Sequence, residues 1–107
     1  MSARLKAILN KNGIKPVATW ENLDSPTTKQ TVTSSIKRCA GVYGIINLIN
    51  GDMYVGSGIC GRMHIRFHKH LYGLNGSHLV SLAVKKYGLD NFAFIVIETI
   101  DGFDLHS

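Results

Sequence analysis

Residues 41–58 read GVYGIINLINGDMYVGSG, and this stretch decides the fold because it predicts a β-hairpin. The first arm, residues 42–49, is rich in β-branched and aromatic residues, which fit a pleated, half-buried surface. Asn50-Gly51 follows as a two-residue turn, since both residues tolerate the positive φ that a type I′ turn requires. Residues 53–56 then return as a short second arm.

Downstream of the hairpin, the pattern predicts two helices and a third strand. The first helix runs from about residue 61 to 72, with apolar residues along one face. Ser77 caps the second helix and Gly88 ends it. Residues 92–100 form a nearly continuous apolar run, which suits a central strand covered by helices. We therefore expect an α+β domain with a small three-stranded sheet, the hairpin plus a third strand, flanked by helices.

The segment before the hairpin is weakly patterned, and we divide the chain into a leader with short helices, residues 1–40, and a domain, residues 41–107. Residues 2–12 predict a short amphipathic helix. This start resembles a mitochondrial transit peptide, or it is an ordinary capping helix packed on the domain. A cap followed by proline at residues 25–26 predicts a second short helix.

The charge indicates a polyanionic partner. Twelve Lys and Arg residues against seven Asp and Glu residues leave a net charge of +5. Between Asp52 and Asp90 the sequence has no acidic residue. Basic residues concentrate in the same segment: Arg62, Arg66, Lys69, Lys85 and Lys86. This concentration favours nucleic acid over the alternative of a merely solvated basic face.

Other classes of site and partner are not expected. Cys39 and Cys60 lack CxxC spacing, so the sequence predicts neither a disulfide scaffold nor a zinc site. His64 and His68 lie four residues apart but have no third ligand at suitable spacing, and a basic helical surface explains them better. No apolar run approaches the roughly 20 residues of a membrane helix, so no membrane partner is expected.

Two tyrosines lie on the hairpin arms, each close to a glycine. Because side chains alternate along strands, Tyr43 and Tyr54 can present their hydroxyls on one face. Arg66 and His70 lie four residues apart and share a face of the first helix, at the rim of the hairpin. Phosphodiester hydrolysis requires a group that orients or deprotonates water and a cation for the charge developing on phosphorus. By themselves, two tyrosines on paired strands are more typical of residues that support a core.

Taken in order, these segments resemble the GIY-YIG nuclease domain, especially the versions in group I introns of fungal mitochondria. The resemblance rests on GVY at 41–43, YVGS at 54–57, RF-x-x-HL at 66–71 and AVKKYGLDNFAFIVIE at 83–98. It covers about residues 41–100. Both isoleucines of the family's name are valine here, a conservative change within strands.

The resemblance implies a role for each matching side chain. Tyr43 would position or deprotonate the attacking water, and Tyr54 would hydrogen-bond the scissile phosphate or assist that activation. Arg66 would stabilise the pentavalent transition state by bidentate contact with phosphate oxygens. His70 would assist proton transfer or fix the geometry around Tyr43. Further nucleic-acid contacts are expected from a glycine and from basic residues: Gly56, Arg62, Lys69, His78, Lys85 and Lys86.

The family also implies one Mg²⁺ ion, bound by a glutamate on a helix beyond the third strand. The sequence ends at Ser107, which leaves no room for that helix, so we assign the metal-binding role to no residue and expect a GIY-YIG domain truncated at its C-terminus. Two hypotheses follow. The first is a mitochondrial homing endonuclease that cleaves DNA. The second is a catalytically inactive relic that binds nucleic acid, for example RNA or a mitochondrial ribosome. Metal-dependent nicking of DNA would distinguish them.

Overall fold

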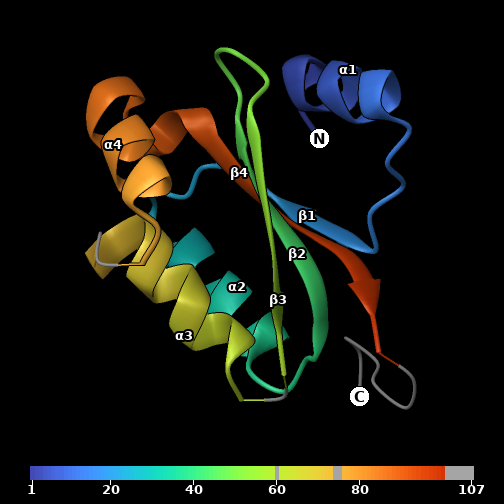
Figure 1. Ribbon diagram of the computed structural model, residues 1–107, viewed down its shortest axis with the longest axis vertical. Coiled ribbons are helices and arrows are strands. Elements are labelled where there is room, and N and C mark those ends of the chain that lie inside the picture. The colour runs from blue at the N-terminus through green and yellow to red at the C-terminus, as the bar shows by residue number, and fades with distance from the viewer. Residues whose placement is uncertain (60, 74–75, 101–107) are drawn as a thin grey trace.

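A four-stranded antiparallel sheet forms the middle layer of the molecule (Figure 1). The computed structural model describes residues 1–59, 61–73 and 76–100. The strands lie in the order β1-β4-β2-β3. Their bounds are Ala18–Trp20 for β1, Gly41–Asn47 for β2, Met53–Gly58 for β3 and Phe92–Thr99 for β4.

Helices cover both faces of this sheet. The α-helices are α1 (Ala3–Asn12), α2 (Pro26–Ile36), α3 (Met63–His68) and α4 (His78–Tyr87). A π-helix, Lys69–Gly73, follows α3 directly, and a 3₁₀ turn, Leu89–Asn91, precedes β4. Helix α1 covers one face alone, whereas α2, α3 and α4 cover the other (Figure 1). In the described part of the chain, no helix has the length and apolar character needed to cross a membrane.

The expected three-stranded sheet is wrong by one strand, because β1 pairs with the far edge of β4. Ala18 lies opposite Val96, and Trp20 lies opposite Phe94. The Val17 amide extends the pairing by donating to the Val96 carbonyl at 2.8 Å. A three-residue strand shows no measurable alternation, so its sequence carries too little signal to predict it. Residues 1–40 therefore contribute a strand to the same sheet as the hairpin.

The hairpin is present, but its predicted two-residue turn is wrong. Strand β2 ends at Asn47, whose amide donates to the Asp52 carbonyl at 2.8 Å. Four residues, 48–51, lie between this pair. The Asn47 side-chain oxygen accepts the Ile49 amide at 2.9 Å, and Gly51 alone of the Asn-Gly pair has a positive φ, +82°. Asparagine side chains commonly accept a hydrogen bond from the backbone amide two residues later and so start a turn. The turn therefore begins directly after β2, two residues earlier than predicted.

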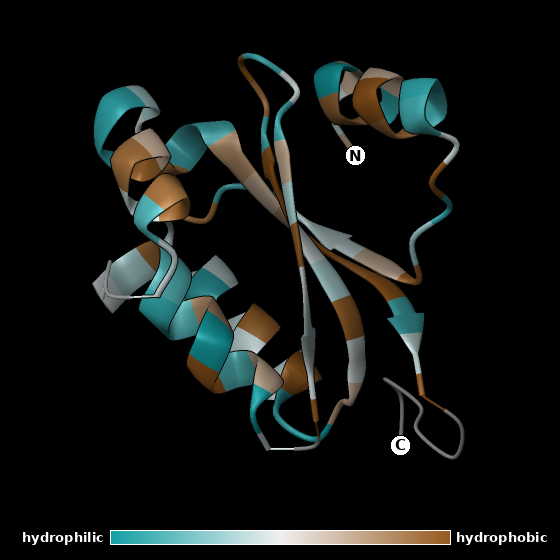
Figure 2. Ribbon diagram, viewed as in Figure 1, coloured by the Kyte–Doolittle hydropathy of each residue, from teal (hydrophilic) through white to brown (hydrophobic). Residues whose placement is uncertain are grey.

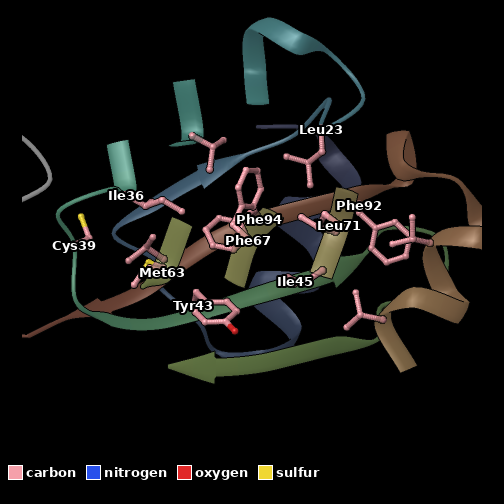
Figure 3. Close-up of a cluster of buried hydrophobic side chains, with 14 residues drawn as sticks. Leu23, Ile36, Cys39, Tyr43, Ile45, Met63, Phe67, Leu71, Phe92 and Phe94 are labelled. Carbon is pink, nitrogen blue, oxygen red and sulfur yellow. The ribbon is translucent and has the colours of Figure 1, made fainter. Parts of the chain in front are cut away.

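The two faces of the sheet pack into two apolar clusters. The main core lies under α2, α3 and α4, and it includes Tyr43, Phe67 and Phe94 (Figure 3). The smaller cluster lies under α1, where Leu5 and Leu9 are buried, as the capping-helix interpretation predicts. Strands β2 and β4 contribute to both clusters, which explains why the sequence of β4 is apolar at nearly every position (Figure 2).

The helices after the hairpin match their predicted positions closely. Helix α3 begins at Met63, two residues later than expected, and its last turn is the π-helix. Phe67 and Leu71 are buried, as predicted. Helix α4 has the predicted serine cap and the predicted terminal glycine. Cys39 is buried and its thiol donates to the Ser35 carbonyl. Cys60 and the tail, residues 101–107, lie outside the described residues.

Candidate active site

The two tyrosines lie on the same face of the hairpin, as the alternation predicts. Tyr43 lies opposite Gly56 across the β2–β3 pairing, and Tyr54 lies opposite Ile45. The Tyr43 ring is only 1% exposed and stacks on Phe94 with ring centroids 5.5 Å apart. Its hydroxyl lies at the margin of the main core, turned towards β3 (Figure 3). Tyr43 therefore serves as a core residue while its polar end reaches the edge of the core.

Gly56 leaves the space that the Tyr43 hydroxyl occupies. A Cβ atom at Gly56 would lie 2.5 Å from the hydroxyl oxygen and 2.7 Å from Cζ of the same ring. Such contacts are far inside van der Waals distance, so any larger residue would displace the ring or the strand. The packing of the Tyr43 ring therefore requires the glycine of the YVG motif, without reference to any ligand. Its predicted approach to nucleic acid stays a prediction.

His70 joins the two tyrosines from the helical side. Its side chain is 4% exposed, and its Nε2 atom lies 3.1 Å from the Tyr43 hydroxyl oxygen. The Tyr54 ring lies with its centroid 5.0 Å from that of the imidazole. On the other side of the ring, Nδ1 accepts a hydrogen bond from the Ser77 amide at 3.0 Å. Every polar atom of this buried imidazole therefore has a partner.

His70 is buried while Arg66, four residues earlier, stays exposed. We expected both at the rim because they lie four residues apart, but only Arg66 lies there. π-Helical turns are rare and are frequently found at functional sites. Here the wider turn begins at Lys69, immediately before His70. His70 shares the buried face of the helix with Met63 and Phe67, so the imidazole lies inward against Tyr43 while the guanidinium lies at the surface.

Burial and charge keep the central pair uncharged near neutral pH. Burial raises the pKa of Tyr43, and the neighbouring Tyr54 raises it further, while the Arg66 guanidinium acts in the opposite direction. Burial also lowers the pKa of His70, and Arg66 adds to this effect. Arg66 therefore lies close enough to act on both groups. The arrangement combines a neutral phenol, a neutral imidazole and one permanent positive charge.

Arg66 also borders a surface cavity together with Arg62. This cavity measures about 490 Å³ and lies beside α3, where β2 begins and β3 ends. Its lining consists of Gly41, Val42, Ser57, Gly58, Ile59, Arg62, Arg66 and Ile100. Two guanidinium groups beside small residues form a site suited to an anion such as phosphate. The structure thus brings one predicted binding residue, Arg62, next to the predicted catalytic Arg66.

The remaining predicted binding residues are exposed but are not part of this cavity. Lys69 lies at the start of the π-helix, His78 begins α4, and Lys85 and Lys86 lie in its last turn. The Lys86 ammonium lies 5.2 Å from the ring centroid of Tyr87. Each side chain is accessible to a polyanion. Their contact with nucleic acid stays a prediction.

Sequence reasoning missed the contact between Ser77 and His70. Gly76 and Ser77 are typical of a turn and a helix cap. Nothing in the sequence indicates that the Ser77 amide contacts a side chain seven residues earlier. A Cβ atom at Gly76 would lie 2.5 Å from the His70 Nδ1 atom, so this glycine is needed for the contact. His68, weighed with His64 as a zinc pair, instead bonds to the Thr33 hydroxyl at 2.8 Å. Among the described residues, no group of three or more His, Cys, Asp or Glu side chains could hold a metal ion.

Comparison with known proteins relates nearly the whole chain to fungal endonucleases. It is 41% identical over 98 residues to the Neurospora crassa protein named "Probable intron-encoded endonuclease bI1", covering 92% of this chain and 22% of that protein. It is 30% identical over 83 residues to "Probable intron-encoded endonuclease 1" of the same fungus, covering 78% of this chain and 27% of that protein. No protein-family profile and no solved structure matches the chain. The chain is therefore homologous to about a quarter of the length of proteins named as intron-encoded endonucleases.

Proposed function

We propose that this chain is a GIY-YIG-type endonuclease domain that hydrolyses DNA phosphodiester bonds. The observation that carries the proposal is the hydrogen bond between Tyr43 and His70, next to Tyr54 and Arg66. A purely structural core has no need of an imidazole bonded to a phenol, since burying polar groups costs free energy unless each finds a partner. The motif order and the two endonuclease relatives support the same interpretation.

In this proposal each side chain acts from the position it holds. The raised pKa of Tyr43 keeps its hydroxyl protonated at neutral pH, so in the resting site it orients the attacking water by hydrogen bonding. Arg66, at the surface, binds the oxygens of the scissile phosphate and stabilises the charge that develops there. Tyr54, half-buried beside His70, donates a hydrogen bond from its hydroxyl to the same phosphate. The Arg62 side of the cavity takes an adjacent phosphate.

Mg²⁺ belongs to this proposal through the sequence resemblance alone. Glu98 is exposed and lies opposite Val42, next to an irregularity in the β2–β4 pairing. Among residues 1–59, 61–73 and 76–100, no three His, Cys, Asp or Glu side chains gather to hold a metal ion. We therefore assign no step of the reaction to a metal. The proposed location, the mitochondrion, likewise rests on the resemblance.

The test is nicking of supercoiled DNA in the presence of Mg²⁺ by the protein as its gene encodes it. Arg66→Ala should lower the rate by about 10²- to 10³-fold, as expected for the loss of a group that stabilises transition-state charge. Arg4→Ala is the matched control. Arg4 is an exposed arginine on α1, on the opposite face of the sheet, and the variant should cleave normally.

The inactive-relic hypothesis predicts a different result from the same assay. Such a protein would bind nucleic acid with an affinity that falls steeply as salt rises, but it would nick nothing at any Mg²⁺ concentration. Binding without cleavage would therefore refute the endonuclease function and support a binding module for DNA or RNA. Nicking that Arg66→Ala leaves unchanged would also refute the proposed site.

A further inference from the structure

The Gly76-Ser77 segment decides which nitrogen of His70 carries hydrogen. A neutral imidazole has one nitrogen that donates and one that accepts. The Ser77 amide can only donate, and it points at Nδ1 from 3.0 Å. Nδ1 must therefore accept, and the hydrogen must be on Nε2. Nε2 faces the Tyr43 hydroxyl at 3.1 Å, so His70 donates to Tyr43 and not the reverse.

This direction changes what each member of the pair can do. Nε2 already holds a hydrogen, so it cannot take the proton of Tyr43. The Tyr43 oxygen accepts the Nε2 hydrogen, and its own hydrogen is directed away from the imidazole. It is then available to a water or phosphate oxygen. If Tyr43 gives up its proton during a reaction, the Nε2 hydrogen stabilises the phenolate that results.

We propose that Gly76 and Ser77 are positioning residues that hold His70 in the Nε2–H tautomer and so keep the Tyr43 hydroxyl hydrogen free for the substrate. Gly76 makes the approach possible, because any Cβ there would lie 2.5 Å from Nδ1. The Ser77 backbone supplies the donor, while its side chain separately caps α4 by accepting the Val80 amide. The inference deepens the proposed function, and its catalytic consequence rests on that function.

The charged and titratable groups around His70 agree with this assignment. Tyr43 contacts it from β2, Tyr54 from β3, and the Arg66 guanidinium acts on it from α3. Protonating Nδ1 would set two donors, the imidazolium and the Ser77 amide, against each other. Burial and Arg66 also disfavour the charged imidazole by lowering its pKa. Burial and Arg66 thus favour the neutral ring, and the Ser77 amide selects its Nε2–H tautomer.

The first test observes the tautomer directly in the wild-type protein. A long-range nitrogen–proton NMR correlation spectrum separates the two tautomers, and the His70 signals are those absent from His70→Gln. The expected result is a pyridine-like Nδ1 and a pyrrole-like Nε2 at neutral pH. A protonated Nδ1, or a mixture of tautomers, would overturn the inference. This measurement needs no catalysis, so it stands apart from whether the protein cleaves DNA.

The second test removes the donor without adding bulk. Ser77→Ala keeps the backbone amide. A second protein, identical to Ser77→Ala except that an ester replaces the amide bond between residues 76 and 77, lacks the N–H group. The ester should lose the single Nε2–H pattern and cleave about tenfold more slowly than Ser77→Ala, the scale of one hydrogen bond. Gly76→Ala, which crowds Nδ1, should shift the same NMR signals. An ester protein with an unchanged tautomer would refute the role of the Ser77 amide.

These outcomes separate the inference from the proposed function. The Nε2–H tautomer in a protein that cleaves nothing would leave the hydrogen-bond assignment standing and remove the endonuclease. Cleavage by a protein whose His70 carries hydrogen on Nδ1 would support the endonuclease and refute the hydrogen-bond assignment.

Discussion

Gly56 lies directly opposite Tyr43 in the hairpin, and the Tyr43 hydroxyl fills the space that a side chain at Gly56 would need. Gly56→Ala should therefore push the phenol out of its bond with His70. We expect a loss of about 1–3 kcal/mol of stability from overpacking, together with loss of cleavage. Urea denaturation and the nicking assay measure the two effects. Val55→Ala, a change at the neighbouring exposed position, is the control and should alter neither.

Removing the Tyr43 hydroxyl should separate its role in the core from its role in the reaction. Tyr43→Phe keeps the stacking on Phe94 but leaves the buried His70 donor without its partner. We expect a cost of about 1–3 kcal/mol in stability and a fall of about 10²- to 10⁴-fold in cleavage rate.

Tyr72→Phe is the matched control for that variant. The Tyr72 hydroxyl also makes a partly buried hydrogen bond, to the Leu23 carbonyl at 2.7 Å, but it lies outside the candidate site. Its loss should cost about 1 kcal/mol of stability and leave cleavage unchanged. Equal losses of cleavage in the two variants would show that stability, not chemistry, explains the effect of Tyr43→Phe.

The lowered pKa of His70 predicts that the protein loses stability in mild acid. Below a pH of about 6.5 the unfolded chain binds a proton at this residue, whereas the folded chain resists it. The free energy of unfolding should therefore fall as pH drops from about 7.5 to 5.5. His68, whose pKa burial lowers too, contributes in the same direction.

Urea denaturation at several pH values measures this dependence. His70→Gln should make it shallower, leaving the part that His68 contributes. His78→Gln is the control, since it changes a histidine outside the candidate site and keeps both His68 and His70. A wild-type dependence equal to that of His70→Gln would contradict the prediction.

The basic end of α4 should contribute to binding without contributing to chemistry. Lys85 and Lys86 are exposed in its last turn, away from the tyrosines. Replacing either by Gln should weaken DNA binding and reduce the slope of log K against log salt by about one for each phosphate that the variant no longer neutralises. Lys6→Gln on α1, across the sheet, should leave the slope unchanged. Equal slopes in all variants would exclude this surface from the nucleic-acid interface.

Much of the fold followed from local patterns. The tyrosine-bearing hairpin, the capped helix α4 and the apolar strand β4 each have a strong signal in a short window. The fourth strand did not, because three residues cannot show alternation and their partners lie near the other end of the chain, as in the pair Thr19–Ile95. The turn differed because the Asn47 side chain, not the Asn-Gly pair alone, closes it.

The candidate site divided in a similar way. Alternation placed Tyr43 and Tyr54 on one face, and helical spacing placed Arg66 near them. The inward position of His70 follows from its place three residues after Phe67 and seven after Met63, on the buried face of the helix, and not from its spacing to Arg66. The Ser77 amide could not be found from residue types at all, because any residue except proline carries the same N–H group.

The bond between Tyr43 and His70 has a consequence for how this chain could change over generations. In a lineage released from selection for cleavage, Phe at position 43 would keep the ring packing, yet it would strand the buried imidazole. Neither residue can drift alone without a stability penalty. Their loss would therefore occur as a paired replacement, and an inactive descendant would carry phenylalanine at position 43 together with an apolar residue at position 70.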